Sequence, residues 1–113
     1  MKYYVAADGG GTKLFATLYD ENFNIISSAA CGGTNHLFRP REEIKRDVEA
    51  LVDDLLPEGI TEIEGFDYSI VGDPAPLIEA LRRKVDIKDC AFRREGDVAH
   101  TRRYSDETAQ YRW

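Results

Sequence analysis

Six residues decide how this sequence folds: Asp8-Gly9-Gly10-Gly11-Thr12-Lys13. Three consecutive glycines let the backbone turn tightly and approach a ligand, and successive N–H groups in such a turn form an anion-binding concavity. Thr12 adds a hydroxyl donor, Lys13 adds a positive charge, and Asp8 is placed to hold a magnesium ion, usually through water. The hexapeptide therefore predicts a turn that neutralises a polyphosphate. A plain glycine-rich hairpin is the alternative, because Asp-Gly is a common hairpin signal.

The segments on either side of the glycines have the pattern of strands. Lys2–Asp8 is an apolar run that predicts a buried strand, and Lys13–Tyr19 alternates between two faces. A Rossmann fingerprint needs a helix after its glycines, and the Walker pattern G-x-x-x-x-G-K-[ST] is absent, so neither motif fits. The turn residues at 20–22 then lead into a third predicted strand, Phe23–Ala30. Short connections make the three strands an antiparallel meander.

Helices and strands alternate after the meander. Pro40 suits a first helical turn, and five aliphatic residues then recur at helical spacing: Ile44, Val48, Leu51, Val52 and Leu55. Phe66–Val71 predicts a strand, Leu77–Val85 a second helix, residues 90–92 a short strand, and Gly96-Asp97 the opening of another helix. Right-handed crossovers add the later strands parallel to the first. We therefore expect an α/β domain over residues 1–98, with a mixed five-stranded sheet and helices on both faces.

Length and composition narrow the class of protein. The chain has 113 residues, which fits one domain, and residues 99–113 carry no periodic core signal and are expected to form a separate tail. A net charge of −6 argues against nucleic acid or an anionic membrane as the partner. The absence of a long apolar run and of a signal peptide predicts a soluble cytoplasmic protein. Cys31 and Cys90 form no C-x-x-C pair and predict ordinary buried thiols.

Two loops carry a resemblance to a known superfamily. Asp8–Lys13 between two strands resembles the first phosphate motif of the actin, heat-shock-chaperone and sugar-kinase superfamily, whose domains have an actin-like ATPase (ribonuclease H-like) fold. Gly32-Gly33-Thr34-Asn35-His36, after the third strand, is similar to a loop in the branch that joins BadF-type ATPases with N-acetylglucosamine kinases. The resemblance covers about residues 1–100 and is strongest over residues 1–36.

The resemblance implies roles for particular residues. The first motif would hold the phosphates of ATP and Mg²⁺, which assigns the metal to Asp8 and the phosphates to the rest of the turn: Gly10, Gly11, Thr12 and Lys13. The second loop would contact an amino-sugar through Thr34 and Asn35. An Asn amide has both a donor and an acceptor for a sugar, whereas a loop residue that caps its own turn is the alternative for Asn35. His36 is expected to be structural.

The resemblance also implies a catalytic base, an Asp that follows a later parallel strand and opens a helix. Asp97 is the best match and could accept the proton of the sugar hydroxyl. A simple helix N-cap is the alternative role for Asp97. Gly96 departs from the Asn, Thr or Ser that often precedes this Asp in the family. Asp73 is a weaker second candidate, because the stretch after Val71 is shorter than expected.

The length limits what this chain could do alone. Kinases of the superfamily close two such domains around ATP, and nothing here matches the second phosphate loop or the adenosine site. We therefore expect one lobe of an ATP-dependent amino-sugar kinase, which acts as a homodimer or with a missing C-terminal lobe. Two alternatives remain: a BadF-type ATPase that activates a partner enzyme, and a non-catalytic assembly module with the same fold.

Overall fold

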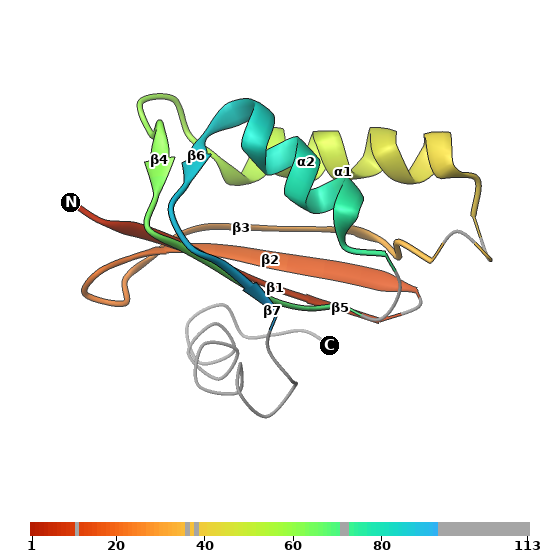
Figure 1. Cartoon of the computed structure of the whole chain (residues 1–113), viewed down its shortest axis with the longest axis horizontal. Coiled ribbons are helices and arrows are strands. Elements are labelled where there is room, and N and C mark those ends of the chain that lie inside the picture. Colours follow the sequence, from red (N-terminus) through yellow and green to blue (C-terminus); the bar gives the residue numbers. More distant parts are fainter. Residues whose placement is uncertain (11, 36, 38, 71–72, 93–113) are drawn as a thin grey trace.

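A mixed five-stranded sheet forms the centre of the computed structural model (Figure 1), which describes residues 1–10, 12–35, 37, 39–70 and 73–92. Its strands are β1 (Tyr3–Gly9), β2 (Lys13–Asp20), β3 (Ile25–Gly32), β5 (Gly65–Ile70) and β7 (Cys90–Phe92). They lie in the order β3-β2-β1-β5-β7, with β1, β2 and β3 antiparallel and with β5 and β7 parallel to β1. The expected meander and its later parallel strands are both present.

The helices are α1 (Arg41–Leu55) and α2 (Ala75–Lys84). The α1 stripe expected from the sequence is buried, with no member more than 2% exposed: Ile44, Val48, Leu51, Val52 and Leu55. In α2, Leu77 and Leu81 are fully buried. These side chains pack against alternate residues of the sheet, including Leu14, Ala16 and Leu18 of β2, all of them 0% exposed. Burial of these apolar side chains is the main stabilising contribution to the fold.

The expectation of helices on both faces of the sheet is wrong for the described part of the chain. Figure 1 shows α1 and α2 together on one face. The connection from β1 to β5 contains α1, and the connection from β5 to β7 contains α2. Both connections step across the sheet in the same direction, so two crossovers of the usual right hand place their helices on the same side. The helix expected at Gly96-Asp97 and the tail 99–113 lie outside the described residues.

A small parallel ladder, which the sequence did not predict, joins the two helical segments. β4 (Glu62–Ile63) pairs with β6 (Asp86–Ile87) as a separate two-stranded sheet. Ile63 is fully buried, and Lys88 lies 3.2 Å from the Glu62 carboxylate. Each strand has only two residues, which is too short for a sequence pattern to distinguish from a loop.

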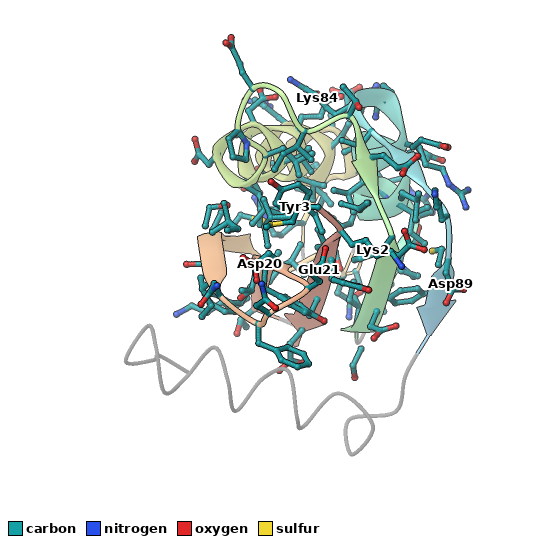
Figure 2. The ribbon with its side chains drawn as sticks, turned by 90° about the vertical axis from the view of Figure 1, so that its left-hand side faces the viewer. Lys2, Tyr3, Asp20, Glu21, Lys84 and Asp89 are labelled. Atoms are coloured by element: carbon teal, nitrogen blue, oxygen red, sulfur yellow. The ribbon has the colours of Figure 1, made fainter. Side chains whose placement is uncertain are left out.

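The third strand begins two residues later than the sequence predicted, at Ile25 instead of Phe23. Asp20 causes the delay, because its carboxylate accepts hydrogen bonds from the backbone N–H groups of Asn22 and Asn24, both at 2.9 Å. Phe23 is left in the turn with a positive φ of 65°. Figure 2 shows this end of the molecule, with Asp20 and Glu21 beside Lys2. The N–H of Lys2 donates to the Glu21 carboxylate at 2.7 Å.

Candidate functional site

The two loops singled out in the sequence lie at one edge of the sheet. β1 and β5 are parallel, and both end at this edge, beside the starts of α1 and α2 at the right of Figure 1. The glycine turn follows β1, and the loop that carries Thr34 and Asn35 follows β3, which is antiparallel to β2 and therefore runs in the direction of β1. In open α/β sheets, ligands bind outside the carboxyl ends of the parallel strands. This edge is therefore the candidate site.

The glycine turn is a tight hairpin between β1 and β2. The N–H of Gly10 donates to the carbonyl of Lys13 at 2.9 Å, directly after the Gly9–Leu14 pair. A Cβ added at Gly9 would lie 3.1 Å from Cδ1 of Leu14, so Gly9 allows close packing in the core. A Cβ added at Gly10 would meet nothing within 4 Å, and Thr12 and Lys13 are exposed. The sequence predicted a hairpin with room for a ligand, and the geometry fits both parts of that prediction.

Asp8 is the last side chain before the glycines. It is half-buried and pairs in register with Phe15 of β2 and Ser69 of β5. Val5 and Ala7, on the other face of the strand, are buried beneath the helices. Strand alternation therefore puts Asp8 on the face away from α1 and α2. A single carboxylate at this position suits Mg²⁺, which is usually bound through one or two carboxylates together with water and substrate phosphates.

The two residues expected to contact a sugar have different surroundings. Thr34 is only 2% exposed, and within the described residues its Oγ1 is the buried side-chain polar atom that has no hydrogen-bond partner. Asn35 is half-buried, and its Oδ1 accepts a hydrogen bond from the N–H of Leu37 at 2.9 Å. That contact is the turn-capping role left open by the sequence. The Nδ2 donor of Asn35 is not needed for it.

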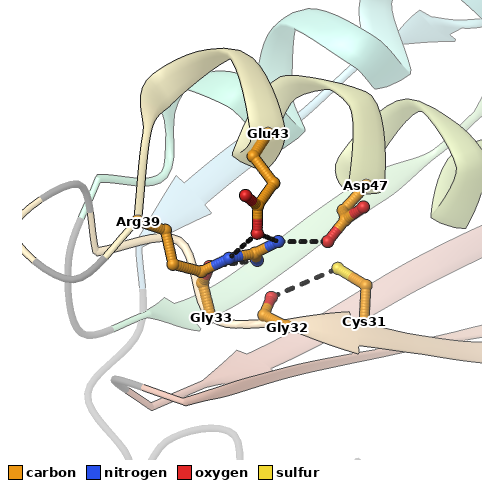
Figure 3. A network of polar contacts seen from close by, with 6 residues as sticks. All are labelled: Cys31, Gly32, Gly33, Arg39, Glu43 and Asp47. Atoms are coloured by element: carbon orange, nitrogen blue, oxygen red, sulfur yellow. Dashed lines mark hydrogen bonds and ion pairs between the residues drawn. The ribbon is translucent and has the colours of Figure 1, made fainter.

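Arg39, which the sequence analysis missed, fastens this loop to α1 (Figure 3). Its Nη1 donates to the carbonyl of Gly33 at 3.0 Å, its Nε and Nη2 donate to one Glu43 oxygen at 3.0 and 2.8 Å, and Nη2 also donates to Asp47. These hydrogen bonds, led by the one to Asp47, raise the pKa of the Arg39 guanidinium. The only available signal in the sequence was Arg39 four residues before Glu43, a common helical pair that does not predict the loop contact.

Gly32 explains why the loop begins with glycine. A Cβ added there would lie 2.5 Å from Nη1 of Arg39. The neighbouring Cys31 thiol donates to the Gly32 carbonyl at 3.3 Å. Burial, reinforced by the negative charge of Asp47, raises the pKa of the Cys31 thiol to about 11. Burial also raises the pKa of Cys90, so both thiols are protonated and unreactive near neutral pH, as expected for ordinary buried cysteines.

A cavity of about 350 Å³ opens between the first turns of the two helices. It lies next to the loop after β3, because Thr34 is part of its wall. The remaining wall comes from both helices and from the residue before α2: Arg41, Ile44, Lys45, Asp73, Ala75, Pro76, Glu79 and Arg83. Asp73, the second candidate for the base, accepts a hydrogen bond from the N–H of Ala75 at 3.0 Å. Asp73 is therefore at least partly engaged in starting α2.

The described residues do not test every expected site residue. Gly11, His36 and Asp97 lie outside them. Over residues 1–10, 12–35, 37, 39–70 and 73–92, no three His, Cys, Asp or Glu side chains group as ligands of a metal ion. Among the same residues, no helix has the length and apolar character to cross a membrane.

Comparison with known proteins adds two solved structures. No protein-family model and no curated protein matches the sequence. The chain is similar to xylulose kinase from Lactobacillus acidophilus, with 22% identity and a TM-score of 0.47 over 62% of this chain. It is also similar to gluconate kinase from the same organism, with 23% identity and a TM-score of 0.47 over 61%. The matches span only 16% and 15% of those two chains. At this TM-score and identity, the likeness by itself decides neither the family nor the activity of this chain.

Proposed function

We propose that this chain is one lobe of a cytoplasmic ATP-dependent sugar kinase that transfers a phosphoryl group to a hydroxyl of an amino-sugar. One observation carries the proposal. The glycine turn, with its Asp, Thr and Lys, and the Thr34–Asn35 loop lie at the same edge of the sheet, where β1 and β5 end. A phosphate-binding turn and a polar loop at one edge are what transfer between two bound substrates needs.

The glycine turn is the proposed nucleotide end of the site. Open space above Gly10 and the exposure of Thr12 and Lys13 fit a group of phosphate size and charge. In this proposal the N–H groups of the turn and the Thr12 hydroxyl donate to phosphate oxygens, Lys13 offsets their charge, and Asp8 holds Mg²⁺ through water. When bound, ATP supplies the phosphoryl group and Mg²⁺ neutralises phosphate charge.

The loop after β3 is the proposed acceptor end. The buried Thr34 hydroxyl lacks a partner among the described residues, and Asn35 has a donor that its own turn does not use. Both groups would orient the amino-sugar, as the resemblance to the BadF and N-acetylglucosamine kinase branch implies. Asp97 would accept the proton of the attacking hydroxyl. A second lobe, from another chain or a second copy, would complete the adenosine site.

Calorimetric titration of the chain with MgATP tests the nucleotide end. The expected result is binding that weakens about tenfold in Lys13→Gln, since a charge-assisted hydrogen bond to phosphate is lost. Lys2→Gln is the matched control, because Lys2 is also exposed and lies at the other end of β1. Equal affinity of the two variants, or no binding of MgATP by the unmodified chain, would contradict the proposal.

Titration with N-acetylglucosamine in the presence of MgATP tests the acceptor end. Asn35→Asp keeps an acceptor for the turn but removes the Nδ2 donor, so sugar affinity should fall while MgATP affinity stays unchanged. Nucleotide binding without sugar binding would instead favour the ATPase activator, and binding of neither ligand would favour the assembly module.

A further inference from the structure

We propose that the cavity between α1 and α2 is a second binding site, separate from the glycine turn, for a small phosphorylated sugar. Its volume of about 350 Å³ lies within the range of small-molecule sites. The choice of a sugar as the organic part rests on the proposed function. The choice of an anion rests on the cavity itself.

The cations of the cavity are the first argument. Arg41 and Lys45 stand one helical turn apart on α1, and both line the cavity. Neither forms an ion pair with any residue in the described part of the chain, whereas Arg83, on the opposite wall, lies 3.3 Å from Glu49. Both helices also begin here, so their positive dipole ends add to the attraction for an anion.

The helix starts do not supply the recognition by themselves. In α2, the N–H of Ala75 donates to Asp73, Pro76 has no N–H, and the N–H groups of Leu77 and Ile78 both donate to the carbonyl of Pro74. The backbone donors of this first turn are therefore engaged. Side-chain charge from Arg41 and Lys45 must do most of the binding, which makes the site testable by substitution.

The polar groups that are not cations point to hydroxyls on the ligand. Asp73 and Glu79 line the same cavity, and carboxylates accept hydrogen bonds from sugar hydroxyls but repel a bare phosphate. The buried Thr34 hydroxyl, without a partner among the described residues, adjoins the cavity wall and can donate or accept after a side-chain rotation. Cations and carboxylates in one small cavity fit a ligand that is anionic at one end and hydroxylated at the other.

Titration of the ¹⁵N-labelled chain followed by NMR is the test, with glucose 6-phosphate as the probe. We expect shifts of the Arg41 and Lys45 amides, and affinity about tenfold lower for Lys45→Gln because one charge-assisted contact is lost. Arg46→Gln is the matched control: it removes the same charge from an exposed neighbour that does not line the cavity, and should change affinity less than twofold. Equal affinity of the two variants would overturn the site.

Further ligands and a variant test the two halves of the ligand separately. Glucose alone and inorganic phosphate alone should each bind at least about tenfold more weakly than glucose 6-phosphate. Phosphate that binds as tightly as the sugar phosphate would overturn the sugar assignment, and glucose that does so would overturn the anion assignment. Thr34→Val, which keeps the shape of the side chain, should lower affinity severalfold without lowering the melting temperature. An unchanged affinity would show that a water molecule, not the ligand, satisfies the hydroxyl.

The same spectra separate this inference from the proposed function. MgATP should shift the amides of Gly10, Thr12 and Lys13, and glucose 6-phosphate should shift those around the cavity. Loss of the first set alone would contradict the nucleotide site, and loss of the second set alone would contradict the cavity.

Discussion

The meander has two turns, one at each end of β2, and they use their polar groups in opposite ways. At the β2–β3 turn the buried Asp20 carboxylate accepts two backbone N–H groups and the Asn24 amide, and two further backbone hydrogen bonds join Asp20 to Asn24 and Phe23. At the β1–β2 turn a single backbone hydrogen bond joins the described residues Gly10 and Lys13, and Thr12 and Lys13 are exposed. A turn that serves the fold satisfies its own donors, whereas a turn suited to a ligand leaves them accessible.

The largest expected effect is from removal of the internal acceptor of the β2–β3 turn. Asp20→Ala leaves the N–H groups of Asn22 and Asn24 without their partner, so the melting temperature should fall by several degrees, more than in any other variant below. Thermal unfolding followed by circular dichroism measures the change. MgATP affinity should be unaffected, because the turn lies at the other end of β2. A parallel loss of nucleotide binding would show that the two turns are not independent.

The next largest effect sharpens the contrast within the glycine turn. Gly9→Ala introduces a Cβ 3.1 Å from Leu14 in the core and should destabilise the fold by about 1 kcal/mol. Gly10→Ala meets open space and should leave stability within about 0.5 kcal/mol, but it should weaken MgATP binding because a methyl group then occupies the approach to the turn. Urea unfolding and calorimetry measure the two quantities. The reverse pattern would assign the two glycines wrongly.

A third loop combines both properties, and Gly32→Ala separates them. The added Cβ would displace the Arg39 guanidinium from Gly33, Glu43 and Asp47, which should cost roughly 1 kcal/mol, since the network is partly exposed. The loop that carries Thr34 and Asn35 should lose order, visible as faster amide exchange at Asn35. Gly59→Ala would be a poor control, because Gly59 has a φ of +95°. Ala30→Gly, at an exposed position of the same strand, tests whether any change in β3 has this effect.

The smallest expected effect concerns acid. The hydrogen bond from the Asn24 backbone, together with weaker contributions from the Asn24 side chain and the Asn22 backbone, holds the pKa of Asp20 below its ordinary value of 3.8. A carboxylate with a lowered folded-state pKa stabilises the fold above its unfolded-state pKa, and this stabilisation is lost as the pH falls through the folded-state pKa. Stability measured between pH 5 and pH 2 should therefore fall less steeply in Asp20→Asn. Identical slopes would contradict the role of the Asp20 charge.

Much of the fold could be predicted from the sequence, because the strands and helices have strong apolar periodicity. The alternation around Leu14 and the helical stripe from Ile44 to Leu55 both match the buried faces. The start of β3 could not be predicted, because one Asp20 side chain outweighs the apolar character of Phe23. The β4–β6 ladder could not be predicted either, since two-residue strands have no period.

The candidate site was predictable only in part. The hexapeptide Asp8–Lys13 indicated a glycine turn, and the composition of the next loop indicated Thr34 and Asn35. Arg39 was missed because its function depends on a backbone carbonyl, which has no sequence signature. The cavity was also missed, because Arg41 and Lys45 become neighbours of Asp73 and Glu79 only when α1 and α2 pack together.

The sequence by itself determined the strands, the helices and the chemistry of the two loops, because these depend on residues close together in the chain. Only the tertiary structure decided that both helices lie on one face of the sheet, since that depends on the direction in which successive crossovers step. It also decided that the glycine turn and the loop after β3 share one edge. Strand direction and pairing order bring those segments together, and no local pattern encodes either of them.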